Sequence, residues 1–102
     1  MFPRDVSPAF TREMGCTTAD WLRTLPAAVG VHALDLPAPG QARVRLSGGG
    51  TLSLHWQVLP ERRIALAVLP RLQVDFAFDG VDADRRSSFM KLFDLTMQRG
   101  GG

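Results

Sequence analysis

The feature that most constrains the fold is an alternation of polar and apolar residues through the middle of the chain. It runs through four stretches, residues 41–46, 51–58, 63–68 and 71–78, and a weaker candidate lies at residues 31–36. A period of two is typical of half-buried β-strands. The intervening segments, residues 47–50, residues 59–62 and a turn around Pro70, are short. Consecutive strands are therefore expected to pair antiparallel in a meander.

Helices are predicted on either side of these strands. Thr17 is a candidate N-cap for a short helix over residues 18–25, and Gly30 is a candidate stop. A second helix is expected after Asp82, because an apolar stripe with helical spacing follows it: Phe89, Leu92, Phe93, Thr96 and Met97. The predicted fold class is α+β, an antiparallel four- to five-stranded meander with a short N-terminal helix and a C-terminal helix packed on one face.

A length of 102 residues indicates one domain over residues 1–102. Residues 1–15 contain Pro3, Pro8 and Gly15 and show no clear period. They are predicted to form an extended N-terminal arm, and residues 98–102 are predicted to form a flexible tail.

The requirement that apolar residues share one face of the sheet fixes a predicted register. It pairs Val44 with Leu54 and Ala42 with Trp56. In the same register Leu66 lies between Trp56 on the preceding strand and Val74 on the following strand. Ile64 pairs with Phe76. The predicted inner face, which the helices must cover, consists of Ala42, Val44, Leu46, Leu52, Leu54, Trp56, Val58, Ile64, Leu66, Val68, Leu72, Val74, Phe76 and Phe78.

The opposite face is expected to be polar, with small residues near its centre. It holds Gln41, Arg43, Arg45, Thr51, Ser53, His55, Gln57, Arg63, Ala65, Ala67, Gln73, Asp75, Ala77 and Asp79. A two-fold axis through this face would lay the arginines of one copy over the aspartates of another, as an isologous dimer requires. The first functional hypothesis is therefore a non-enzymatic binding or self-association module that forms a homodimer through Ala65, Ala67, Ala77 and Asp75.

A second hypothesis is that the same face binds a small anionic ligand. The predicted register brings Arg43, Arg45 and His55 close together, and forked guanidinium groups beside a histidine suit a carboxylate or a phosphate. A concave pocket around these residues would favour the ligand. A flat surface covered by a second chain would favour the dimer.

A third hypothesis is an enzyme that uses Cys16, which precedes a predicted helix N-terminus where a thiolate would be stabilised. Nothing in the spacing places His32 or His55 near this cysteine, and the chain has no CxxC, HxH or HExxH pattern typical of a zinc site. We therefore expect a protein without catalytic activity, metal or cofactor.

Charge and hydropathy restrict the class of partner. Twelve basic and ten acidic residues give a net charge of only +2, and the predicted outer face has no aromatic residue for base stacking. Specific nucleic-acid binding is therefore not expected. The longest apolar run, residues 64–69, is too short to span a membrane. The single cysteine and the lack of an apolar N-terminal stretch favour a cytoplasmic protein.

Three segments carry a resemblance to other proteins: residues 10–17 (FTREMGCT), 54–60 (LHWQVLP) and 89–102 (FMKLFDLTMQRGGG). In these segments the chain resembles a group of short proteobacterial proteins without an assigned activity. The resemblance covers nearly the whole chain and implies a stand-alone bacterial protein. It implies no activity, cofactor or catalytic residue.

Overall fold

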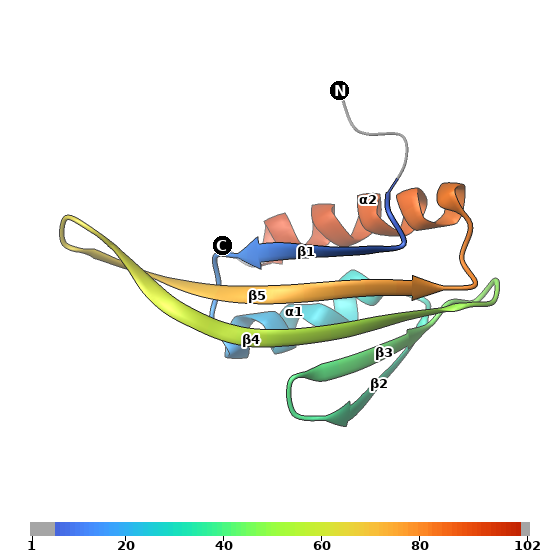
Figure 1. The fold of residues 1–102 in the computed structure, drawn as a ribbon, viewed down its shortest axis with the longest axis horizontal. Helices are drawn as coiled ribbons and strands as arrows, with labels where there is room; N and C mark the ends of the chain where they lie inside the picture. Colours follow the sequence, from blue (N-terminus) through green and yellow to red (C-terminus); the bar gives the residue numbers. More distant parts are fainter. Residues whose placement is uncertain (1–5, 101–102) are drawn as a thin grey trace.

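The computed structural model describes residues 6–100, which form a five-stranded antiparallel sheet with two helices (Figure 1). This confirms the predicted α+β class. The elements in chain order are β1 (Ala9–Met14), α1 (Thr18–Val29), β2 (Ala33–Ala38), β3 (Gln41–Arg45), β4 (Thr51–Ile64), β5 (Ala67–Asp79) and α2 (Ala83–Gly100). The strand order across the sheet is β1-β5-β4-β3-β2, so β1 joins the meander at its far edge.

Residues 9–14 of the segment predicted to be an N-terminal arm form a strand of the sheet. β1 pairs antiparallel with β5, and Phe10 stacks on Phe76 with ring centroids 4.7 Å apart. The sequence pattern concealed this strand because Arg12 occupies an inward position. Its guanidinium lies over the Phe10 ring at 5.4 Å and pairs with Asp94 of α2. Residues 1–5 of the predicted arm lie outside the described residues.

The helix starts are those predicted, but both helices continue further than expected. The Thr17 side chain accepts a hydrogen bond from the Asp20 N–H at 3.1 Å, and Asp82 caps α2 in the same way through the Arg85 N–H at 2.9 Å. α1 continues through Pro26 to Val29, and Gly30 ends it by donating its N–H to the Pro26 carbonyl. α2 is helical to Gly100, so residues 98–100 of the predicted tail are part of this helix. Residues 101–102 lie outside the described residues.

Both helices pack on one face of the sheet and form one core with it. Trp21 of α1 and Phe93 of α2 are fully buried and meet edge to face, with centroids 6.0 Å apart. Phe93 also packs edge-on against Phe76 of β5 at 5.6 Å. Burial of a large apolar side chain contributes about 1.5–3 kcal/mol, so contacts of this kind hold the two layers together. Leu92, which the sequence pattern assigned to the buried stripe, is instead 66% exposed.

The register of the meander differs from the predicted one. Val44 pairs with Leu52 rather than Leu54, Ala42 pairs with Leu54 rather than Trp56, and Trp56 pairs with Val74. The β3–β4 register is set by a tight turn in which the Leu46 N–H donates to the Gly50 carbonyl at 3.0 Å. The partner of Trp56 differs because β4 and β5 form a single long hairpin: they are 14 and 13 residues long, and the turn that joins them lies at residues 65–66. The predicted loop at residues 59–62 and the predicted turn at Pro70 are both inside strands.

Two prolines lie inside the long hairpin, at an irregularity of its ladder. Pro60 and Pro70 lie where the β4–β5 register shifts, between Leu59 and Arg62. A β-bulge accommodates a residue that has no N–H to donate to the ladder. The extra residue in β4 also reverses its alternation beyond the bulge. Beyond the bulge Arg63 pairs with Val68 and Ile64 pairs with Ala67. Ile64 does not pair with Phe76, because the turn lies directly after it at residues 65–66.

Candidate functional site

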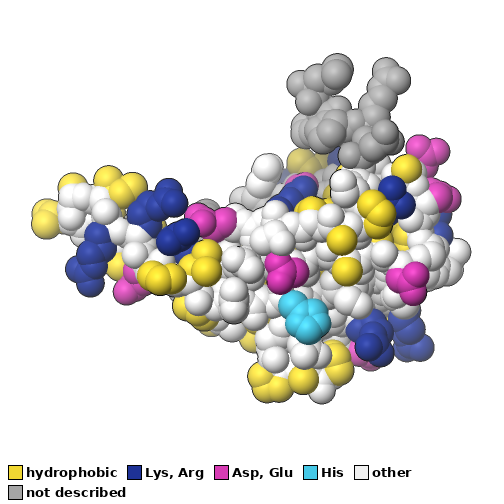
Figure 2. All heavy atoms as spheres, in the orientation of Figure 1, with side chains coloured by type: hydrophobic (Ala, Val, Ile, Leu, Met, Phe, Trp, Pro, Cys, Tyr) yellow, Lys and Arg dark blue, Asp and Glu magenta, His cyan; other side chains and the backbone are white. Residues whose placement is uncertain are grey.

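Figure 2 shows the face of the sheet away from the helices, which we call the outer face. The residues predicted to bind an anion, Arg43, Arg45 and His55, are exposed and alternate with residues buried under the helices, so they lie on this face. Arg43 lies opposite Ser53 and Arg45 opposite Thr51, whereas His55 lies between Gln41 and Asp75. The structure therefore places the two arginines and the histidine in three successive rows of the sheet.

Carboxylates lie beside these basic groups. Asp35 of β2 is opposite Arg43 and approaches Arg45 Nε at 3.8 Å. Asp75, the neighbour of His55 across the sheet, accepts a hydrogen bond from Thr11 at 2.7 Å. An anion on this face would meet negative as well as positive groups.

The residues predicted to form the dimer contact do not lie together. Ala77 and Asp75 are exposed at the centre of the outer face, where Ala77 lies between Ala9 and Ser53. Ala65 and Ala67 are at the far end of the β4–β5 hairpin. Ten positions separate Ala67 from Ala77 along β5, which is roughly 33 Å of extended chain. The four residues do not form one patch.

The end of the hairpin is the most unusual surface of the molecule. We call residues 58–71 the hairpin extension. β1 ends at Met14 opposite Leu72, and β3 pairs with β4 no further than His55, so no other strand of the described chain pairs with the extension. Figure 1 shows it projecting beyond both helices.

Apolar side chains cover this extension. Val58, at 71%, and Leu66, at 101% of its reference area, are exposed, and so are Ile64, Val68 and Leu69. The sequence analysis placed four of these five, all but Leu69, on the buried face of the sheet. That assignment is wrong because the helices end before this part of the hairpin. Figure 2 shows apolar and basic side chains together on the projecting part.

A cluster of charges links the extension to the sheet. Arg71 donates to Glu13 of β1 at 2.6 Å and to the Pro60 carbonyl of β4 at 3.2 Å, while Arg62 lies 3.6 Å from Glu13. The hydrogen bond from Arg71 is the main cause that lowers the pKa of Glu13; burial opposes it, and the charges of Arg71 and Arg62 add to it. These contacts join three strands at the start of the extension.

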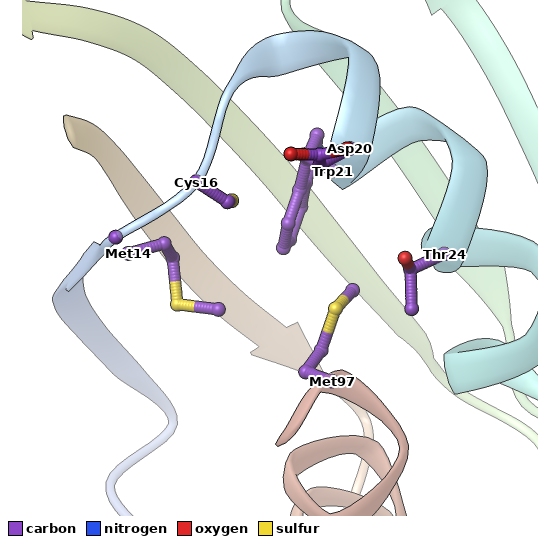
Figure 3. Close-up of a pocket in the computed structure, with 7 residues that line it drawn as sticks. Met14, Cys16, Asp20, Trp21, Thr24 and Met97 are labelled. Atoms are coloured by element: carbon purple, nitrogen blue, oxygen red, sulfur yellow. The ribbon is translucent and has the colours of Figure 1, made fainter. Parts of the chain in front are cut away.

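A cavity of about 100 Å³ lies between the end of β1, the start of α1 and the last turn of α2 (Figure 3). Figure 3 shows the side chains of Met14, Cys16, Trp21 and Met97 around this space. The full lining consists of Met14, Gly15, Cys16, Asp20, Trp21, Thr24 and Met97. Two buried polar atoms of these residues, Trp21 Nε1 and Thr24 Oγ1, have no hydrogen-bond partner. The walls of the cavity are mostly apolar.

The environment of Cys16 is the reverse of what a nucleophile needs. Burial raises the pKa of its thiol, and the negative charge of Asp20 raises it further. Nucleophilic cysteines have lowered pKa values, because the thiolate is the reactive form. His32, a candidate base, accepts the Ser47 N–H on Nδ1 at 3.0 Å and packs on Phe89. The observed contacts of His32 are therefore structural.

Within residues 6–100 no group of three or more His, Cys, Asp or Glu side chains is arranged to hold a metal ion. Neither α1 nor α2 is long and apolar enough to span a bilayer. The chain matches no protein-family model, no curated protein and no solved structure.

Proposed function

We propose that this protein is a non-enzymatic self-association module whose homodimer forms through the hairpin extension. The observation that carries the proposal is a two-stranded ribbon with exposed apolar side chains, covered neither by a helix nor by a third strand of the described chain. The proposal keeps the homodimer expected from the sequence but moves its centre from the outer face to the extension.

The energetics of the extension favour a partner. A two-stranded hairpin is marginally stable in water unless another strand or a helix packs on it. Exposed apolar side chains that gather on one part of a surface mark sites of interaction. Val58 and Val68 lie on the helix side of the ribbon, and Ile64 and Leu69 lie on its other side. Leu66 would contribute about 1.5–3 kcal/mol if a partner buried it completely, and the other four, which are already partly covered, would contribute less.

A second copy of the chain is the occupant that fits best. A two-fold axis across the middle of the extension lays two extensions antiparallel, so one face of a ribbon meets the same face of the other copy. Glu61 and Arg63 are both exposed near the middle, and an antiparallel pairing brings charges of opposite sign close. Two of the three arginines, Arg62 and Arg71, already pair with Glu13, so the extension is not a strongly basic surface for nucleic acid.

Binding of a small anion at Arg43, Arg45 and His55 remains the alternative, with weaker support. The three residues lie in separate rows, and carboxylates of Asp35 and Asp75 lie beside them. The cavity lies on the helix side of the sheet and is lined by none of the three.

The test is sedimentation equilibrium on the wild type, Leu66→Glu and Ala77→Glu. Both substitutions put a carboxylate at an exposed position, one at the tip of the extension and one at the centre of the outer face. We expect a wild-type dimer that Leu66→Glu dissociates and Ala77→Glu does not. A monomeric wild type at tens of micromolar refutes the proposal. Dissociation by Ala77→Glu alone would place the interface on the outer face.

A further inference from the structure

We infer that the tip of the hairpin extension inserts Leu66 into the cavity of the partner copy, beside the partner's Cys16. This inference rests on the proposed dimer and names the surface that receives the extension. It is argued from the position of the cavity, its chemistry, the shape of the tip and the length of the extension.

The cavity lies at the base of the extension. Met14, one of its lining residues, pairs with Leu72, and Leu72 pairs with Val58 on the next strand. These three residues form one row across the sheet, at the point where the extension begins. The extension thus has an exposed apolar side chain at its tip and an apolar cavity at its other end.

The size and walls of the cavity suit an aliphatic side chain. At about 100 Å³ it is several times larger than the space of one water molecule, about 30 Å³. Met14 and Met97 contribute flexible thioethers, which adapt to the shape of an inserted group. Leu66, fully exposed on its own chain, is a ligand of matching chemistry.

The backbone at the tip of the extension leaves the Leu66 side chain exposed. Ala65 has φ 53°, a left-handed conformation that glycine usually provides and that is strained for alanine. Strained residues persist where the surrounding structure holds them in place. The turn at Ala65 leaves Leu66 as the most exposed large apolar side chain of the described chain.

The length of the extension fits a reciprocal exchange. From Val58 to the turn is about seven residues, or roughly 23 Å of strand. A two-fold axis through the middle of this length brings each tip to the base of the other extension. Both contacts then form together, as an isologous interface requires.

The native cysteine provides the test. Cys16 is the single cysteine of the chain and lines the cavity. Leu66→Cys introduces a second thiol at the position that the inference places beside Cys16 of the partner copy. Oxidation with diamide, which takes up the two thiol hydrogens, should join the introduced thiol of one copy to Cys16 of the other. A covalent dimer is expected on a non-reducing gel. It should be lost in Leu66→Cys/Cys16→Ser and should not form with Leu36→Cys, an exposed position on β2.

Three results would overturn the inference. A covalent dimer that survives in the Cys16→Ser background shows that tip meets tip. A Leu66→Cys protein that sediments as a dimer yet forms no disulfide places the tip elsewhere, and the proposed dimer stands. A monomeric wild type removes both proposals.

A second measurement does not depend on dimerisation of the cysteine variant. The rate at which Cys16 reacts with Ellman's reagent should fall at least ten-fold as wild-type concentration rises through the dimerisation range, and it should stay constant in Leu66→Glu. A rate independent of concentration in a sample that dimerises contradicts the inference.

Discussion

Replacement of Leu66 by alanine should weaken the dimer strongly and leave the fold intact. The side chain is fully exposed in the single chain, so its loss should change the free energy of unfolding of the monomer very little. In the dimer each of two Leu66 side chains loses three buried carbons. At about 0.8 kcal/mol per carbon this is about 2.4 kcal/mol at each site and about 5 kcal/mol for the symmetric pair. A factor of ten in affinity corresponds to about 1.4 kcal/mol, so the dissociation constant should rise by roughly a thousand-fold or more.

Sedimentation equilibrium measures the dissociation constant, and urea unfolding at low protein concentration measures the stability of the monomer. Leu36→Ala is the matched control, because Leu36 is an exposed leucine on β2, away from the extension. It should change neither quantity. The reasoning fails if Leu66→Ala leaves the dissociation constant of a dimeric wild type unchanged. It also fails if the variant destabilises the monomer by as much as a buried Leu→Ala change, about 2–5 kcal/mol.

Three further predictions concern the fold, its pH dependence and the cysteine. Phe93→Ala should lower the free energy of unfolding by about 3–5 kcal/mol in urea titrations, because the ring is fully buried against Trp21 and Phe76; a loss below about 1 kcal/mol would contradict the described core. The pKa of Glu13 is lowered in the folded state, so its contribution is present at neutral pH and is lost as the pH falls through the folded pKa. The wild type should therefore lose more stability between pH 7 and about pH 3 than Glu13→Gln, and equal losses would show that the pairing with Arg71 is unimportant. The raised pKa of Cys16 predicts alkylation by iodoacetamide at neutral pH more slowly than free cysteine, and a faster reaction would contradict its burial.

The amino-acid pattern predicted the layers of the fold better than the lengths of its parts. Alternation correctly assigned Val44, Leu52, Leu54, Val74 and Phe76 to the buried face. Helical spacing and capping residues correctly predicted where both helices begin. These signals are local, since each depends on residues a few positions apart.

The errors came from contacts between distant segments. Pro60 and Pro70 are ordinary loop signals, and only their placement opposite each other at a bulge keeps them inside strands. Arg12 obscured β1 because its inward position depends on Asp94, which is 82 residues away. The period of the apolar residues predicts which side chains share a face of the sheet. It does not predict how far the helices extend over that face.

For the same reason the candidate site was only partly visible in the sequence. Residues 64–69 were recognisable as the longest apolar run, but their exposure depends on where α1 and α2 end. The residues that line the cavity come from β1, α1 and the last turn of α2. Met14, Trp21 and Met97 are far apart in the sequence, so no local pattern predicts that they share a cavity. Cys16 was considered as a nucleophile because it precedes a helix. In the structure its side chain lines the cavity.

Hydrogen exchange on the unmodified protein, measured at low and high micromolar concentration, tests the central claim most directly. The account predicts that backbone amides of residues 58–71 exchange rapidly in dilute samples and become protected as the dimer forms. Amides of β3, which pairs with the first part of β4 and not with the hairpin extension, should be insensitive to concentration. Protection that grows with concentration in β3 but not in the hairpin extension would contradict the account.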